Sequence, residues 1–148
     1  MPADPAARAR VRLWNVHLDS VLSPAQFTLF MNKDEATEAA KREALDAALC
    51  VYEDQLVGPY LCGDHFTLAD VAALPFFERL LVSLREFKGY DPVPTDRYPR
   101  LTAWLDVAME RASFAVTRRP EDKLIEVYRM FFNRDYAFGG LNRNANKS

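Results

Sequence analysis

The chain has 148 residues, of which 49% are hydrophobic and 12% aromatic, and its formal net charge is −2. This length fits one domain with its own core, and the small net charge argues against general nucleic-acid binding. No apolar run reaches the roughly 18 residues of a membrane-spanning helix, and the first residues lack the apolar segment of a secretory signal. Two cysteines do not make a disulfide framework, so we expect a cytoplasmic protein.

The first helix is predicted to begin at Pro5. Residues 1–4 have the character of a linker, and proline suits a first helical position because its missing N–H would have no partner there. Apolar residues then recur at helical spacing over residues 11–22 and again over 27–31. Pro24 lies between these runs and should bend the helix, because it cannot donate a backbone hydrogen bond.

A second helix is predicted to follow, capped by Asn32 or Asp34 and ending near Gly58. Glu38 and Arg42 stand four residues apart and can form an ion pair on its exposed side. Its apolar stripe, which should face the core, consists of Leu45, Leu49, Tyr52 and Leu56.

The helix predicted over residues 68–87 is the centre of the expected fold. Thr67 can cap it, with Asp70 reaching back to the Thr67 amide in a capping box, and Phe66 can pack on Val71 as a hydrophobic staple. The helix is apolar nearly all round, which predicts burial on every side. Asp70 then lies at a buried end, where hydrogen bonds must compensate for the burial of its charge.

Two further helices are predicted after a proline-containing loop. One begins at Pro99, and the other at Pro120 after a short connection over residues 113–119. The core face of the last helix is predicted to consist of Leu124, Val127, Tyr128 and Phe131. We therefore expect an all-α domain over residues 5–133, a bundle of about five main helices around the central one, followed by a polar tail over residues 134–148.

Several motifs together resemble one known family. Gly63 is followed by FTLAD, then by PFFERL, and later by YPRL at residues 98–101. This combination resembles the C-terminal helical domain of cytosolic glutathione transferases, and the order of the predicted helices is similar over about residues 3–141. PFFERL and the segment DYAFGGL at residues 135–141 are most similar to the omega class, with lambda-type enzymes next in similarity. Omega-class members are thiol transferases and dehydroascorbate reductases that use a catalytic cysteine.

The resemblance implies that the chemistry lies outside this chain. In the family, glutathione and the catalytic residue are held by a preceding thioredoxin-like domain, and this sequence has no βαβ pattern for one. Neither cysteine is followed by proline, as the omega catalytic cysteine usually is. We therefore expect a substrate-side domain without a catalytic residue, inactive alone, either excised from a longer chain or a natural solitary module. Glutathione or another small thiol would be bound mainly by the thioredoxin-like domain.

By the same resemblance, the substrate side of an omega-like site is lined by the end of the first helix, an arginine of the central helix and an aromatic residue of the last one. In this sequence these positions are Ser23, Gln26, Phe30, Arg79 and Tyr128. The resemblance also implies a homodimer, with apolar surface on the first two helices.

Two of these residues have a simpler interpretation that stays open. Arg79 follows Glu78 and could be in an ion pair with it, whereas a guanidinium near a cleft would suit an anionic or polar substrate. Tyr128 lies on the same stripe as Leu124, which favours a role in the core.

The remaining candidates for chemistry are isolated residues. Cys62 and His65 form C-x-x-H, but a metal site needs three or four ligands, so no metal is expected. Cys50 lies within a helix and is interpreted as a small buried hydrophobe. His17 has no partner in the sequence that would make it a base, so a surface or half-buried position is expected.

A second function stays open beside the enzyme. Domains of this kind also resemble parts of translation elongation factors and aminoacyl-tRNA synthetases, where they assemble complexes without catalysis. PFFERL and residues 135–141 favour the omega-like enzyme, because a shared fold does not decide between the two functions.

Overall fold

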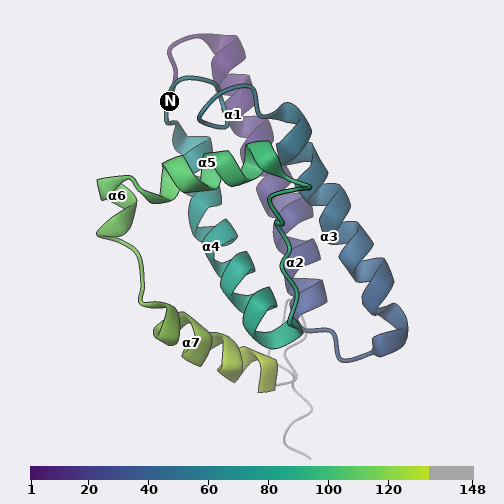
Figure 1. Cartoon of the computed structure of the whole chain (residues 1–148). Coiled ribbons are helices and arrows are strands. Elements are labelled where there is room, and N and C mark those ends of the chain that lie inside the picture. Colours follow the sequence, from purple (N-terminus) through teal and green to yellow (C-terminus); the bar gives the residue numbers. More distant parts are fainter. Residues whose placement is uncertain (134–148) are drawn as a thin grey trace, which may run out of the picture.

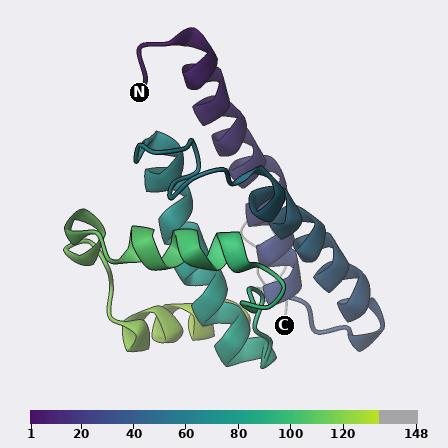
Figure 2. The same cartoon turned by 45° about the horizontal axis from the view of Figure 1, so that its top comes forward.

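The computed structural model describes residues 1–133, and this part of the chain is helical without a strand (Figure 1). The elements are α1 (Pro5–His17), η1 (Leu18–Leu22), α2 (Ser23–Phe30), α3 (Glu35–Gln55), α4 (Leu68–Lys88), α5 (Pro99–Met109), α6 (Ala112–Ala115) and α7 (Glu121–Asn133). α4 packs against α1, α2, α5 and α7, and Figure 2 shows α5 crossing over it. The predicted all-α bundle around a central helix is therefore confirmed. None of the described helices is long and apolar enough to span a lipid bilayer.

The irregularity predicted at Pro24 is a turn of π-helix. In η1 the chain makes a wider turn, and the Ser23 amide donates to the Leu18 carbonyl. Pro24 then lies in the first turn of α2, where its missing N–H is tolerated. A π-turn of this kind accommodates a residue that cannot continue the α-helical ladder, so α1 and α2 follow each other without a loop.

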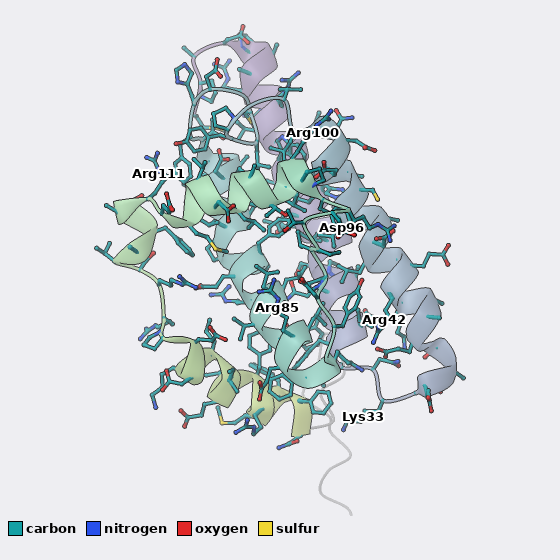
Figure 3. The ribbon with its side chains drawn as sticks, viewed as in Figure 1. Lys33, Arg42, Arg85, Asp96, Arg100 and Arg111 are labelled. Carbon is teal, nitrogen blue, oxygen red and sulfur yellow. The ribbon has the colours of Figure 1, made fainter. Side chains whose placement is uncertain are left out.

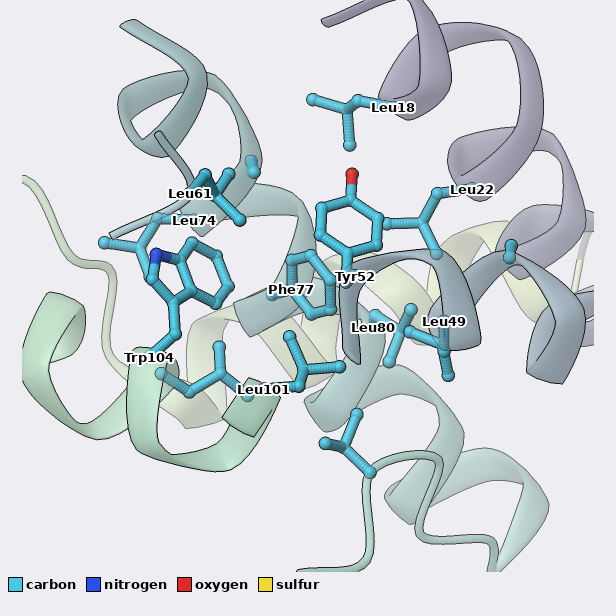
Figure 4. Packing of buried hydrophobic residues seen from close by; sticks show 14 of the residues in the cluster. Leu18, Leu22, Leu49, Tyr52, Leu61, Leu74, Phe77, Leu80, Leu101 and Trp104 are labelled. Carbon is cyan, nitrogen blue, oxygen red and sulfur yellow. The ribbon is translucent and has the colours of Figure 1, made fainter. Parts of the chain in front are cut away.

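Of the two residues predicted to cap α3, the structure has Asp34 as the N-cap. The Asp34 carboxylate accepts a hydrogen bond of 3.1 Å from the Ala36 amide, whereas the buried Asn32 donates to the Asp34 carbonyl at 2.7 Å. Glu38 and Arg42 form the predicted ion pair, at 3.2 Å. The predicted apolar stripe is buried in full, and its Tyr52 ring lies between those of Trp14 and Phe77, with centroids 4.7 and 4.9 Å away (Figure 4 shows Tyr52 and Phe77).

α4 begins with the predicted capping box. Asp70 is 0% exposed, and its Oδ2 accepts the Thr67 amide at 2.8 Å and the Thr67 hydroxyl at 3.0 Å. Its Oδ1 accepts the Leu61 amide at 2.8 Å and the Trp104 indole N–H at 2.9 Å. Four donors thus compensate for the burial of this carboxylate, and they connect α4 to α5 and to the loop before it.

The prediction that α4 is buried on every side is wrong in its first turn. Leu68 is 44% exposed and Val71 is 52% exposed, so Val71 is not the buried half of a hydrophobic staple. Neighbouring elements cover only the opposite side of this turn, where Ala69 and Asp70 are buried. The turn therefore presents an apolar face to solvent.

The later helices differ from the prediction in detail. α5 begins at Pro99 as predicted, with the Glu53 carboxylate of α3 accepting the Arg100 and Leu101 amides at 3.1 and 2.9 Å. The predicted connection over residues 113–119 overlaps the one-turn helix α6, whose Phe114 is buried.

The predicted core face of α7 is wrong at two positions. Val127 is 42% exposed and Phe131 is 37% exposed. The half-buried side instead contains Leu124, Tyr128 and Phe132, which follow one another at intervals of four residues. Such spacing forms one straight stripe along a helix, and α7 packs against α4. The predicted tail at residues 134–148 lies outside the described residues, as does DYAFGGL.

Candidate functional site

Four aromatic rings from three helices meet at one end of the bundle. Phe30 at the end of α2 lies within ring-centroid distances of 5.5 Å of Phe87 in α4, 5.1 Å of Tyr128 and 5.6 Å of Phe132 in α7. Phe87 and Phe132 are 5.3 Å apart. We call Phe30, Phe87, Tyr128 and Phe132 the aromatic cluster. The Phe30–Phe87 and Phe30–Tyr128 pairs stand edge to face, and such pairs contribute about 0.5–1.5 kcal/mol each beyond area burial. The contacts therefore hold the buried Phe30 ring and three half-buried rings in one arrangement.

Two of the predicted substrate-side residues are members of this cluster. Phe30 is buried and Tyr128 half-buried, and their rings stand edge to face. Burial raises the pKa of Tyr128, and the positive charge of Arg79 offsets part of that rise. The structure therefore packs Phe30 of α2 on Tyr128 of α7, and Arg79 of α4 lies near enough to Tyr128 to act on it electrostatically.

Arg79 is not in the ion pair that its sequence neighbour offered. Glu78 is buried and accepts the Arg118 guanidinium at 2.5 Å, from the connection between α6 and α7. Arg79 is exposed, and its guanidinium carbon lies 5.8 Å from the centroid of the Phe76 ring. Within residues 1–133 it makes no ion pair, so its charge is available beside the aromatic cluster.

Ser23 and Gln26 lie on α2, on the same side as Phe30. Their spacing of three and then four residues puts all three on one helix face. Gln26 is buried and Ser23 is half-buried. No hydrogen bond between described residues joins either of them to Arg79 or Tyr128, so their role stays a prediction.

Sequence reasoning missed two members of the cluster. Phe87 was read as the end of the central helix, and Phe132 was not assigned to the core face of α7. The spacing of four residues between Tyr128 and Phe132 was the available signal for the second. Phe87 is recognised only once α2 and α4 are known to end side by side.

The isolated cysteines and histidine show no joint chemistry. Cys50 and Cys62 are free thiols and half-buried, and burial raises the pKa of Cys62. In residues 1–133 no three His, Cys, Asp or Glu side chains are close enough together to hold a metal ion. His17 is half-buried, with Nε2 3.0 Å from the Ala48 carbonyl oxygen.

A second surface feature lies at the other end of the bundle. A hollow of about 600 Å³ between α1 and α3 is lined by apolar side chains that include Leu13, Trp14, Val51 and Val57. Leu13 and Val57 are largely exposed. An exposed apolar surface of this kind indicates an interaction site.

Residues 34–106 match the family model described as "Glutathione S-transferase, C-terminal domain". The chain carries a glutathione S-transferase C-terminal domain. It is 27% identical over 126 residues to glutathione S-transferase U19 of Arabidopsis thaliana, a match that covers 85% of this chain and 56% of that relative. The chain therefore spans about half the length of this curated relative.

Solved structures with the same fold include two glutathione transferase classes. The structure of glutathione transferase Omega 3C from Trametes versicolor superposes with a TM-score of 0.71 and 26% identity, covering 80% of this chain and 52% of that one. The Tau class glutathione S-transferase of mango, Mangifera indica, gives a TM-score of 0.79 at 22% identity, covering 88% and 61%. At that identity the second match supports the fold alone.

Proposed function

We propose that this domain forms the substrate-side wall of an omega-like, glutathione-dependent thiol transferase or dehydroascorbate reductase. The observation that carries the proposal is the aromatic cluster with Arg79 beside it, which makes no ion pair within residues 1–133. Aromatic rings exclude water and offer apolar contact to a substrate, and a guanidinium recognises a carboxylate on the same substrate. The relatives named glutathione S-transferases and the omega-class structure support glutathione as the thiol.

In this proposal the reactive cysteine and the glutathione site belong to a thioredoxin-like domain. The thiolate of that cysteine attacks one sulfur of a disulfide substrate and expels the other sulfur as a thiolate. Glutathione then attacks the resulting mixed disulfide and releases the cysteine. The present domain orients the substrate against the aromatic cluster, and Arg79 attracts its anionic group. The chain alone has no thiol-transfer activity.

Two surfaces are assigned to partners in the same proposal. The exposed Leu68 and Val71 at the start of α4 form an apolar face against which the thioredoxin-like domain packs. The hollow between α1 and α3 supplies part of a homodimer interface. The free thiols of Cys50 and Cys62 fit a reducing, cytoplasmic location.

The test measures how the protein encoded by the entire reading frame reduces two different disulfides. We expect glutathione-dependent reduction of dehydroascorbate and of hydroxyethyl disulfide, and none with residues 1–148 alone. Arg79→Gln should lower kcat/KM for an anionic disulfide such as dithiodipropionate by roughly tenfold, the size of one charged contact, and leave neutral hydroxyethyl disulfide unaffected. Arg119→Gln, an exposed arginine outside the cluster, is the control.

Two results would count against this function. Equal loss for the anionic and the neutral disulfide would remove Arg79 from substrate recognition. A reading frame that encodes no thioredoxin-like segment would favour the other candidate, a protein-binding module such as those of translation elongation factors and aminoacyl-tRNA synthetases.

A further inference from the structure

A partly buried polar network joins three helix ends next to the aromatic cluster. Glu38 Oε2 accepts the Asn32 side-chain amide at 2.9 Å and the Lys88 ammonium at 3.1 Å. Glu38 Oε1 accepts the Arg42 guanidinium at 3.2 Å. Lys88 also donates to the Asn32 carbonyl. We call Asn32, Glu38, Arg42 and Lys88 the polar clamp; Figure 3 shows Arg42 beside this corner of the bundle.

Two members of the clamp are shielded from water and two are partly exposed. The Lys88 side chain is 10% exposed and Asn32 is 7% exposed, whereas the side chains of Glu38 and Arg42 are 21% and 39% exposed. Charged hydrogen bonds that are shielded in this way are stronger than surface ion pairs and hold their partners in one geometry. Glu38 is the centre of the clamp, because each of the other three side chains donates to it.

The clamp acts on the same backbone segments that carry two rings of the aromatic cluster. Asn32 follows Phe30 by two residues, and Lys88 directly follows Phe87. The Phe30 and Phe87 rings stand edge to face, 5.5 Å apart at an interplanar angle of 83°. The position of one ring relative to the other is therefore set by how the ends of α2 and α4 are held together.

Among residues 1–133, the α7 side of the cluster has no polar network comparable to the clamp. α7 has no buried residue, and its ion pair to α4, between Arg129 and Glu86 at 3.4 Å, is exposed on both sides. Exposed pairs of this kind contribute about 0–1 kcal/mol. Tyr128 and Phe132 of α7 consequently take their places from the Phe30 and Phe87 rings on which they pack.

We infer that Glu38 is a positioning residue for the aromatic wall. By holding Asn32 to Lys88 it fixes the buried Phe30 ring and the half-buried Phe87 ring, and thereby the half-buried side of the cluster, formed with Tyr128 and Phe132, that is offered to an apolar, anionic substrate. The inference rests on the proposed function for the role of that surface. The clamp itself requires only the described contacts.

The experiment uses Glu38→Gln in the 148-residue chain, which keeps the size of the side chain and removes its charge. Nuclear Overhauser contacts report the ring geometry, and titration with 8-anilinonaphthalene-1-sulfonate, an apolar anion, reports the surface. We expect weaker contacts between the Phe30 and Phe87 rings and a loss of dye affinity of roughly 2- to 30-fold, the range of indirect couplings. Glu43→Gln, an exposed position on the same helix, is the matched control.

Lys88→Met is the second variant, because it removes the opposite arm of the clamp. If both residues act through one contact, the double variant loses no more dye affinity than either single variant. Folded variants with unchanged ring contacts would overturn the inference. Altered ring contacts with unchanged dye affinity would support the clamp and contradict the proposed function, because the wall would then not be a binding surface.

Discussion

Asp70→Ala tests the origin of the fold. The carboxylate is fully buried and accepts four hydrogen bonds, two of them from the buried Leu61 amide and the buried Trp104 indole. Each buried donor left without a partner costs about 1–3 kcal/mol, and the lost cap of α4 costs about 1 kcal/mol. The lower ends add to about 3 kcal/mol, and they are appropriate because removing a buried charge also recovers part of its desolvation cost.

For a domain of this size, about 3 kcal/mol corresponds to a fall in Tm of roughly 6–12 °C. Thermal unfolding followed by circular dichroism measures it. Asp64→Ala, an exposed aspartate in the same loop, is the control and should unfold close to the unsubstituted chain. Asp70→Asn should fall between the two, because an amide keeps one accepting oxygen. If Asp70→Ala unfolds at the temperature of Asp64→Ala, the carboxylate does not hold α4, α5 and the loop together.

Three further predictions concern other parts of the chain. Burial raises the pKa of Glu38, but hydrogen bonds from Asn32 and Lys88 outweigh it, so the pKa is lowered overall. The contribution of Glu38 to stability is therefore present above its ordinary pKa and is lost as the pH falls through the folded value. Between about pH 6 and about pH 3, Glu38→Gln should lose less free energy of unfolding than the unsubstituted chain. The neighbouring Lys41, Arg42, Lys88 and Asp34 are kept unchanged in this comparison. Glu53→Ala frees the Arg100 and Leu101 amides, so their hydrogen exchange should accelerate roughly five-fold, as expected for a lost cap of about 1 kcal/mol; unchanged exchange would refute the cap. Phe30→Ala should weaken dye binding much more than Phe27→Ala, as measured by fluorescence titration. Equal losses of dye affinity in the two variants would exclude the aromatic cluster as the binding surface.

Local signals in the sequence were sufficient for most helix boundaries. Thr67, Asp70 and Pro99 act on amides or turns within a few residues of themselves, so their effects can be predicted from spacing alone. The buried stripe of α3 followed from helical periodicity in the same way. These features need no knowledge of which helices become neighbours.

The errors and the alternatives left open both concern contacts with a distant partner. Glu78 is paired with Arg118, forty residues further along, which decides against the open alternative of a pair with adjacent Arg79. Val71 is exposed because the described helices cover only the other side of its turn. The polar clamp joins Glu38 to Lys88 across 50 residues, and no short-range pattern predicts such a pair.

The most direct test of the substrate wall is a titration of the isotope-labelled 148-residue chain with 8-anilinonaphthalene-1-sulfonate, followed by NMR chemical shifts. This ligand combines apolar rings with a negative charge, which are the two features that the aromatic cluster and Arg79 should recognise. We predict that the largest shift changes occur at Phe30, Arg79 and Tyr128. Changes confined to the hollow between α1 and α3, or none at saturating ligand, would contradict the account.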